Sequence, residues 1–383
     1  MGGWLNLPVE VIREATNMPA SHSDMPAARD APERLKERPK KLAGRMTAGM
    51  TAEELKAQIE ALGDTDYVVR GTAGGGEIRA FAATTRRTVQ VARDAHQTSP
   101  VVTAALGRLL TAGAMMGSML KDPGELLSLV IRGDGPIASL TVTADSEGHV
   151  KGFAGNPDVW LPLNAQGKLD VAAAVGKGDL TVIQDTIWGE PYCSQLELLT
   201  GEIGDDIGAY YVQSEQIPTS VGVGVLVETD LSVRQAGGFI VQAMPDCSEE
   251  ALDRLAENLS GMSSVTRLLD EGLAPADILE RVLDGLGFEP LEVSPCSFAC
   301  NCSRERTTRV LISLGRDELQ KLIDEGEPVE LSCNFCSSKY TFSLDEVREL
   351  VDEMAPAGDG ETGEKADDDS AAGDTPGEAG AIE

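Results

Sequence analysis

The stretches Phe298-Ala-Cys300-Asn-Cys302 and Cys333-Asn-Phe-Cys336 decide how the C-terminal part of this chain folds. Each carries a closely spaced pair of cysteines, and residues 303–332 separate the two pairs. A short α/β insert between such pairs can bring four thiolates to one point, and zinc prefers four soft ligands in a tetrahedron, with sulfur at about 2.3 Å. The spacing therefore predicts one Zn²⁺ with four thiolate ligands: Cys300, Cys302, Cys333 and Cys336.

The residues alone leave other interpretations of these cysteines open. An Fe–S cluster would use the same ligand type, and four unrelated buried cysteines would hold no metal. Zinc keeps thiols deprotonated, and oxidation needs both thiolate character and access. The four residues can therefore act as an inert structural staple or as an oxidant sensor, in which Cys333 and Cys336 close a small disulfide loop once zinc leaves.

Length, charge and composition exclude several classes of protein. The chain has 383 residues, a formal net charge of −31 and 4% aromatic residues. Nucleic-acid binding relies on clustered Lys and Arg and on aromatic stacking, so we expect no nucleic-acid partner. The N-terminal sequence MGGWLNLPVEVIREATN lacks the basic and apolar regions of a secretory signal, so we expect a reducing, cytoplasmic location. The apolar stretch Val101–Leu120 holds Arg108 mid-span, which favours a core helix over a membrane span.

Changes in composition and periodicity predict an α+β protein in five parts. Residues 1–65 are weakly patterned and predict a flexible extension, with a better helical pattern at Thr51–Leu62. Residues 66–247 predict a core domain of antiparallel strands with packed helices, one of which opens at Ser99-Pro100. The glycines at 74–76 fit a hairpin loop. The strands expected after the helices are Leu126–Arg132, Ile137–Ala144, His149–Ala154, Leu180–Ile187 and Ser220–Val227.

The pattern changes twice in the C-terminal part. Residues 248–295 have a helical period and predict a linker whose apolar stripes, Leu252–Leu259 and Ile278–Leu283, must be buried on another element. If the C-terminal module covers them, its loss uncovers apolar surface. Residues 296–354 predict that small zinc-binding module, with a strand at Thr307–Leu314, a helix at Asp317–Glu325, a strand at Lys339–Phe342 and a capping box at Ser343. Residues 355–383 predict an acidic disordered tail.

No other motif in the sequence predicts catalysis. His22, His96 and His149 are scattered, and His96 follows Arg93 and Asp94 on a polar helix end, where we expect a solvated imidazole. We expect no histidine or carboxylate near the cysteines, which argues against a hydrolytic zinc site because that needs an open position and a base.

With these motifs in place, the chain from about Asp66 to Met354 resembles the 33-kilodalton chaperonin family, a family of redox-regulated heat-shock chaperones. The two cysteine pairs stand in the family's order at the expected end of the chain. The stretches similar to the family's N-terminal domain are Ile78-Arg-Ala-Phe-Ala-Ala-Thr84, Leu106-Gly-Arg-Leu-Leu-Thr-Ala-Gly-Ala-Met-Met116, Gly133-Asp-Gly-Pro136, Gly152–Pro157 and Gly237-Gly-Phe-Ile-Val-Gln242.

The resemblance implies an ATP-independent holdase with no catalytic turnover. Reduced members are inactive and bind zinc through residues matching the four cysteines. The resemblance further implies that oxidation forms the disulfides Cys300–Cys302 and Cys333–Cys336, releases the zinc and unfolds the linker. Oxidised members tend to form homodimers, bind unfolding client proteins through the core domain, and pass them to ATP-driven foldases.

This chain departs from the family at Cys193, Cys247 and Cys296, which lie outside the two pairs. We expect the first two to be ordinary domain cysteines and Cys296 to be a spectator, although it could compete for a disulfide or for zinc. The alternative function is a thiol–disulfide oxidoreductase using Cys333 and Cys336. A catalytic C-x-x-C usually begins a helix, whereas a strand is expected here after Cys336.

Overall fold

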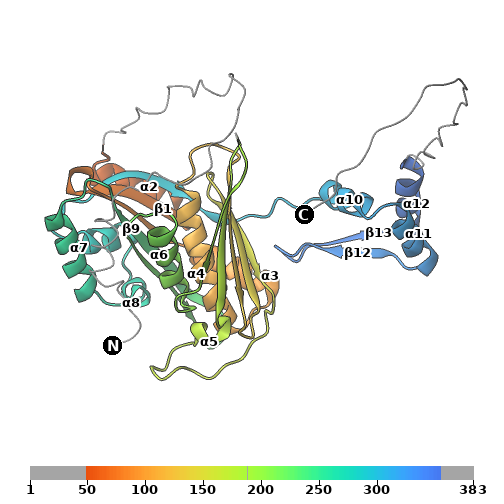
Figure 1. The fold of residues 1–383 in the computed structure, drawn as a ribbon, viewed down its shortest axis with the longest axis horizontal. Helices are drawn as coiled ribbons and strands as arrows, with labels where there is room; N and C mark the ends of the chain where they lie inside the picture. The colour runs from red at the N-terminus through yellow and green to blue at the C-terminus, as the bar shows by residue number, and fades with distance from the viewer. Residues whose placement is uncertain (1–48, 188, 355–383) are drawn as a thin grey trace, which may run out of the picture. The chain divides into compact units, whose positions relative to one another are not determined.

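A computed structural model describes residues 49–187 and 189–354 and gives the α+β fold expected from the sequence (Figure 1). The described residues divide into two compact units. The first holds the chain through Cys302 together with Ser332–Lys339, and the second holds Ser303–Leu331 and the chain from Tyr340 onward. Most of the predicted flexible extension and the whole predicted acidic tail lie outside the described residues.

The first sheet of unit 1 is antiparallel and is buried on both faces. Its strand order is β10-β1-β2-β9-β8. Along β2, Ile78 and Ala80 belong to one hydrophobic cluster, whereas Phe81 and Ala83 belong to the other, because successive side chains point to opposite faces. The strands are β1 Tyr67–Ala73, β2 Ile78–Thr84, β8 Thr219–Val227, β9 Val233–Ala243 and β10 Glu289–Pro295.

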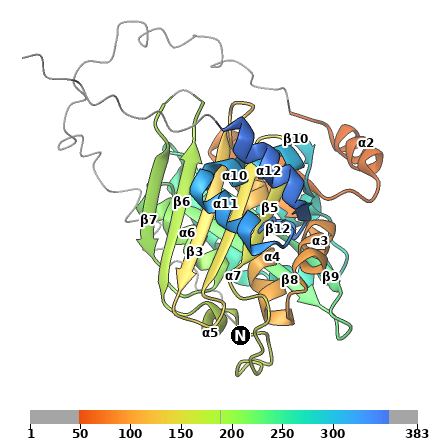
Figure 2. The same cartoon turned by 90° about the vertical axis from the view of Figure 1, so that its right-hand side faces the viewer.

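The second sheet has the order β11-β5-β4-β3-β6-β7 (Figure 2). Every pairing in it is antiparallel except that of β11 with β5, which is parallel. The chain therefore reaches the first cysteine pair directly from an edge strand of this sheet. The strands are β3 Leu126–Gly133, β4 Ser139–Asp145, β5 His149–Ala154, β6 Gly178–Asp185, β7 Tyr192–Glu197 and β11 Ser297–Phe298.

Helix α4 (Pro100–Gly117) lies between the two sheets and contacts β2, β8 and β9 of the first and β3, β4 and β5 of the second. Gly107 permits the close approach of α4 to β8 and to the neighbouring helix, since a Cβ there would lie 2.9 Å from Val225 Cγ2 and 2.6 Å from Val89 Cγ1. Among the described helices, α4 alone is long and apolar enough to cross a membrane, yet 89% of the window is buried inside the fold, as expected for a core helix. The layer also holds α3 Arg86–His96, α5 Val171–Val175 and α6 Ile203–Gln213.

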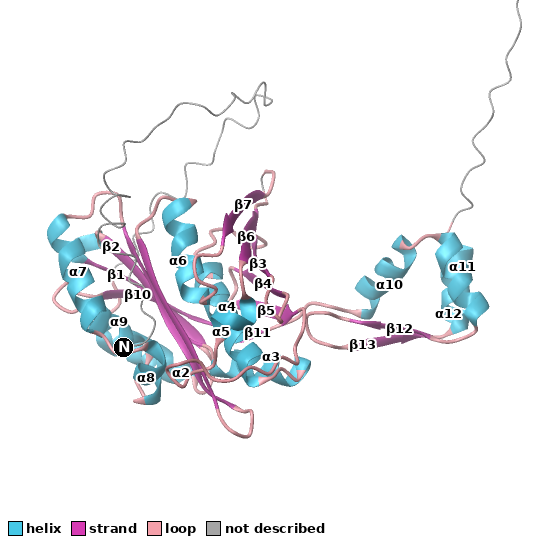
Figure 3. Ribbon diagram, turned by 60° about the horizontal axis from the view of Figure 1, so that its bottom comes forward, coloured by secondary structure: helices cyan, strands magenta, loops and turns pink. Residues whose placement is uncertain are grey.

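Three linker helices cover the outer face of the first sheet: α7 Glu249–Gly261, α8 Val265–Asp270 and α9 Pro275–Val282 (Figure 3). Leu255, Leu259, Ile278 and Val282 share one cluster with the strands. The apolar stripes are thus covered by the sheet of the core, and not by the C-terminal module that the sequence suggested as their cover.

The predicted ends of the core domain differ from the structure in two places. The helical pattern at Thr51–Leu62 is confirmed as helix α2 (Ala52–Leu62), but the helix packs on the core instead of belonging to a flexible extension, because Thr51 and Glu54 make a capping box and Leu55 is buried against the first sheet's outer cluster. Residues 289–295, within the predicted helical linker, form strand β10, because β1 offers a free edge for backbone pairing. The glycine segment Gly74–Gly76 is the short 3₁₀ turn η2 between β1 and β2, in agreement with a hairpin loop.

Unit 2 is a small helical module with a two-stranded hairpin. Its buried core consists of Leu311, Leu319, Phe342, Val347 and Val351. The predicted strand Thr307–Leu314 is wrong: the segment is helical, because Ser303 caps it and its apolar residues, of which only Leu311 is buried, do not alternate between two faces. The elements are α10 Arg304–Ser313, α11 Arg316–Glu325, β12 Val329–Ser332, β13 Lys339–Phe342 and α12 Leu344–Glu353.

Candidate metal centre

The first cysteine pair follows β11, and backbone hydrogen bonds hold it beside β5. Ser297 N donates to Gly148 O at 2.9 Å, and Ala299 N donates to Val150 O at 3.0 Å. Lys151 Nζ then donates to Asn301 Oδ1 at 2.7 Å, between the two cysteines of the pair. The edge of the second sheet therefore fixes the backbone before Cys300 and the side chain of Asn301 after it.

The second pair lies on a tight loop, which we call the cysteine loop and define as Cys333–Ser338. Cys333 N donates to Ser338 O at 2.9 Å, and Ser337 N donates to Cys333 O at 2.8 Å. Ser337 closes the turn with a φ of 58°. Such a turn brings the sulfurs of Cys333 and Cys336 to the same side of the loop.

Together the two segments place four sulfur atoms around one point. Cys300 Sγ lies 3.7 Å from Cys333 Sγ, and Cys302 Sγ lies 3.4 Å from Cys336 Sγ. All four sulfurs lie within 4.8 Å of one another. A tetrahedral ion with metal–sulfur bonds of about 2.3 Å needs sulfur separations of about 3.8 Å, so the donor set and its spacing fit one zinc ion.

The surroundings shift the pKa values of Cys300, Cys333 and Cys336 in different directions. Burial would raise the pKa of Cys336, but hydrogen bonds with Ser338 and with the neighbouring thiols lower it to about 7. Burial raises the pKa of Cys300 to about 12 and also raises the pKa of Cys333. A cation at the centre would favour the thiolate form of all of them, because metal coordination deprotonates a thiol.

The remaining cysteines lie apart from this quartet. Cys296 is 2% exposed and packs in the core between the sheets, where burial raises its pKa far above the ordinary thiol value. Its Sγ contacts Thr84 O at 3.8 Å. Cys193 is exposed on β7, and Cys247 is half-buried before α7. None of the three belongs to the cluster of possible ligands.

The expectation that no histidine or carboxylate lies near the cysteines is wrong. Asp145, Glu147 and His149 line a cavity of about 360 Å³ together with Cys300. His96, expected to be a solvated imidazole, contacts the cysteine loop through Phe335 and Ser337. Sequence reasoning missed these residues because they are distant in the chain and become neighbours only when β4, β5 and α3 assemble.

The cysteine loop does not resemble a helix-initiating redox motif. Two residues, Ser337 and Ser338, follow Cys336, and strand β13 begins at Lys339. The strand was expected from the sequence and is confirmed. The helix dipole that lowers the pKa of many catalytic cysteines has no counterpart at this loop.

Comparisons with known proteins agree with this architecture. The sequence profile of the family described as Hsp33 protein matches residues 66–343. The chain is 51% identical to the 33 kDa chaperonin of Agathobacter rectalis over 75% of this chain and 99% of that protein, and 47% identical to the 33 kDa chaperonin of Clostridioides difficile over 76% and 99%. The crystal structure of the 33 kDa chaperonin, a heat shock protein 33 homolog, from Thermotoga maritima superposes with a TM-score of 0.71 at 35% identity, covering 75% of this chain and 98% of that one. With its fold, its cysteine order and its relatives in agreement, this chain belongs to the Hsp33 family of chaperones.

Proposed function

We propose that the chain is a redox-regulated, ATP-independent holdase of the stress response, which is inactive while one Zn²⁺ occupies the quartet and active after oxidation. The observation that carries this proposal is the approach of four thiols to within 4.8 Å of one another. When bound, zinc supplies a cross-link between the two cysteine segments and keeps the sulfurs in the thiolate form that oxidants attack. The protein binds unfolding chains without chemical turnover.

Oxidation would convert each pair of thiolates into a disulfide with the loss of two electrons. Hydrogen peroxide accepts the two electrons and, with two protons from solvent, becomes two molecules of water; hypochlorous acid, with one proton, becomes chloride and water. We propose the pairs Cys300–Cys302 and Cys333–Cys336. The structure also places Cys300 Sγ 3.7 Å from Cys333 Sγ and Cys302 Sγ 3.4 Å from Cys336 Sγ, so disulfide mapping must distinguish the proposed pairs from pairs that join the two segments.

Loss of zinc removes folding free energy on the order of 10 kcal/mol from the cysteine segments. A folded domain has a net stability of only about 5–15 kcal/mol. This loss therefore destabilises unit 2, whose core holds only five buried apolar residues. It also destabilises the segment from β10 to β11, which leads into Cys300. Strand β10 leads back along the chain to α9, so the disturbance reaches the linker helices.

The linker helices cover the apolar surface that we propose for client binding. Val69, Ile78, Phe239 and Val241 on the outer face of the first sheet lie in one cluster with the buried residues of α7–α9. If these helices detach, both the sheet face and the helix stripes become available to apolar segments of unfolding proteins. The net charge of −31 favours solubility of this exposed state.

The test compares the reduced zinc-loaded protein with the same protein treated with peroxide at elevated temperature. Zinc release is followed with a chromogenic chelator, disulfides are mapped by mass spectrometry, and light scattering reports aggregation of a thermally unfolding client enzyme. We expect one zinc per chain to be released as two disulfides form and client aggregation to be suppressed only afterwards. Equal suppression by both forms would refute the switch.

Two variants separate the quartet from the other cysteines. Cys336→Ser removes a ligand and is expected to lower zinc content and to suppress client aggregation without oxidant. Cys193→Ser, at an exposed cysteine outside the quartet, is the matched control and should behave as the unsubstituted protein. The oxidised protein is further expected to form a homodimer in size-exclusion chromatography and to release its client for refolding when an ATP-dependent foldase is added.

The alternative function is a thiol–disulfide oxidoreductase in which the closely spaced pair Cys333 and Cys336 acts catalytically. Reduction of insulin by dithiothreitol distinguishes the two functions. An oxidoreductase accelerates the cleavage of insulin disulfides, whereas a holdase leaves the rate of cleavage unchanged and delays precipitation of the freed chains.

A further inference from the structure

The cysteine loop is held by side chains of the core domain that are not ligands. Phe335, between the two cysteines, packs edge-on against Phe153 of β5, with ring centroids 5.2 Å apart and planes at 86°. Lys151 Nζ lies 4.8 Å from the centroid of the Phe335 ring. Lys151 also donates to Asn301, so this one side chain contacts both cysteine segments.

His96, the last residue of α3, makes the most specific contacts with the loop. Its Nε2 lies 3.1 Å from Gly152 O and 3.0 Å from Phe335 O, and its Nδ1 lies 3.2 Å from Ser337 Oγ. Carbonyl oxygens can only accept hydrogen bonds, so Nε2 carries a proton, and Nδ1 shares a hydrogen bond with the Ser337 hydroxyl. The imidazole thus joins β5 to the loop.

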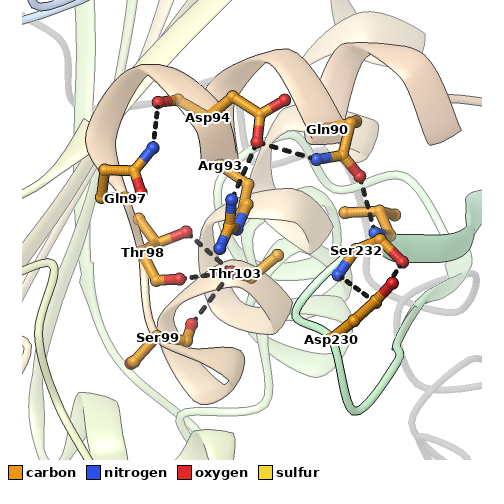
Figure 4. A network of polar contacts seen from close by, with 10 residues as sticks. Gln90, Arg93, Asp94, Gln97, Thr98, Ser99, Thr103, Asp230 and Ser232 are labelled. Atoms are coloured by element: carbon orange, nitrogen blue, oxygen red, sulfur yellow. Dashed lines mark hydrogen bonds and ion pairs between the residues drawn. The ribbon is translucent and has the colours of Figure 1, made fainter.

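A polar network that includes Gln90, Arg93, Asp94 and Gln97 surrounds the C-terminal part of α3 (Figure 4), the helix that ends at His96. Asp94 Oδ1 accepts from Gln90 Nε2 and from Arg93 Nη1, both at 2.9 Å. Gln90 Oε1 accepts from the backbone N of Val233 at 2.7 Å, and Gln97 Nε2 donates to Asp94 O at 2.7 Å. The helix end is thereby tied to the first sheet as well as to its own turn, so His96 is presented on a rigid element.

We propose that this surface of the core, formed by His96, Lys151 and Phe153, is a docking site for the cysteine loop that sets how tightly the metal is held. The inference rests on the zinc site proposed above. The first cysteine pair is already fixed on β5 by the pairing of β11, so docking of the loop on the same strand brings the second pair to it before metal binds. A preorganised ligand set binds more tightly than one that must be ordered at the moment of binding.

The structure makes His96 a positioning residue in this arrangement, since it contacts the loop and not the sulfurs. The reduced full-length protein is loaded with zinc, and transfer of zinc to an excess of chelator is timed. We expect His96→Ala to release zinc about tenfold faster, because the loop loses hydrogen bonds to Phe335 and Ser337. Val91→Ala, at an exposed position on the same helix, is the matched control and should release zinc at the unsubstituted rate.

Two further measurements separate positioning from general destabilisation. His96→Gln keeps a side-chain N–H donor and is expected to restore part of the slow release, and the melting temperature of each variant shows whether the core remains folded. In a double-mutant cycle, Ser337→Ala should accelerate release in the unsubstituted protein but add little in His96→Ala, because the two side chains share one hydrogen bond.

The outcomes distinguish this inference from the proposed function. Zinc release from His96→Ala at the unsubstituted rate, or additive effects in the cycle, overturns the docking site while leaving the zinc site intact. A wild-type chain that binds no zinc in its reduced form overturns both. Faster release in His96→Ala, rescue by His96→Gln and non-additivity with Ser337→Ala support the inference.

Discussion

Leu279→Ala tests whether the linker helices conceal the client-binding face. Leu279 is 0% exposed on α9 and packs in the cluster formed with the outer face of the first sheet. Replacing a buried leucine by alanine costs about 2–5 kcal/mol through lost burial and the cavity that remains. We take a cost of about 3 kcal/mol, and each ~1.4 kcal/mol changes an equilibrium constant tenfold. The open population of the linker is therefore expected to rise about 100-fold while zinc stays bound.

The assay is amide hydrogen exchange on the reduced, zinc-loaded protein, combined with light scattering of an unfolding client. We expect protection of the α7–α9 amides to fall about 100-fold, protection of β3 and β4 to change little, and client aggregation to be suppressed without oxidant. Glu280→Ala, at the next and exposed position of α9, is the control and should change neither readout.

Two results would refute the reasoning about Leu279. An equal fall in protection throughout the core would show that α7–α9 do not open as a separate unit. A selective fall that leaves client aggregation unchanged would show that the covered sheet face is not where clients bind.

Three further perturbations give distinct expectations. Removing zinc from the reduced protein with a strong chelator should abolish the separate melting transition of unit 2 in calorimetry and lower the helical signal in circular dichroism. The core should still melt cooperatively. An unchanged transition of unit 2 would contradict metal-dependent folding. Burial, aided by the charges of Asp206 and Glu202, raises the pKa of Asp205 to about 6, so the folded state binds this proton more tightly than the unfolded chain, and the stability falls as pH rises from about 4 to 6. In urea unfolding, Asp205→Asn should therefore add on the order of 1 kcal/mol at pH 7.5 and less at pH 5; an equal gain at both pH values would contradict this origin. Gly107→Ala should destabilise the core by at least about 2 kcal/mol, because the added methyl overlaps Val89, whereas Gly261→Ala, with nothing within 4 Å, should be neutral or slightly stabilising in the same melts.

Local signals were sufficient where neighbouring residues decide the structure. Ser99-Pro100 correctly marked the start of α4, Ser343 and Glu346 form the expected capping box, and the four paired cysteines do converge. In each case the responsible groups lie within a few residues of one another, or belong to a ligand pattern with a known geometry.

The rest depended on contacts between distant segments. The β-branched run at Thr307–Leu314 suggested a strand, but the cap at Ser303 and the single buried residue Leu311 made it a helix. The segment Glu289–Pro295 carries two prolines and has no strand pattern of its own, yet it pairs with β1 as an edge strand. His96 contacts residues more than 200 positions away, so its role at the cysteine loop has no signature in the sequence around it.

The two ends of the segment 303–332 return to one place, since the cysteines that flank it converge within 4.8 Å. This interval does not form a module by itself, because Leu311 and Leu319 share one core with Phe342, Val347 and Val351 of the chain that follows the cysteine loop. Both segments of unit 2 are therefore joined at their ends to the four sulfurs, so a chemical change at the sulfurs reaches that unit through three points of the chain at once.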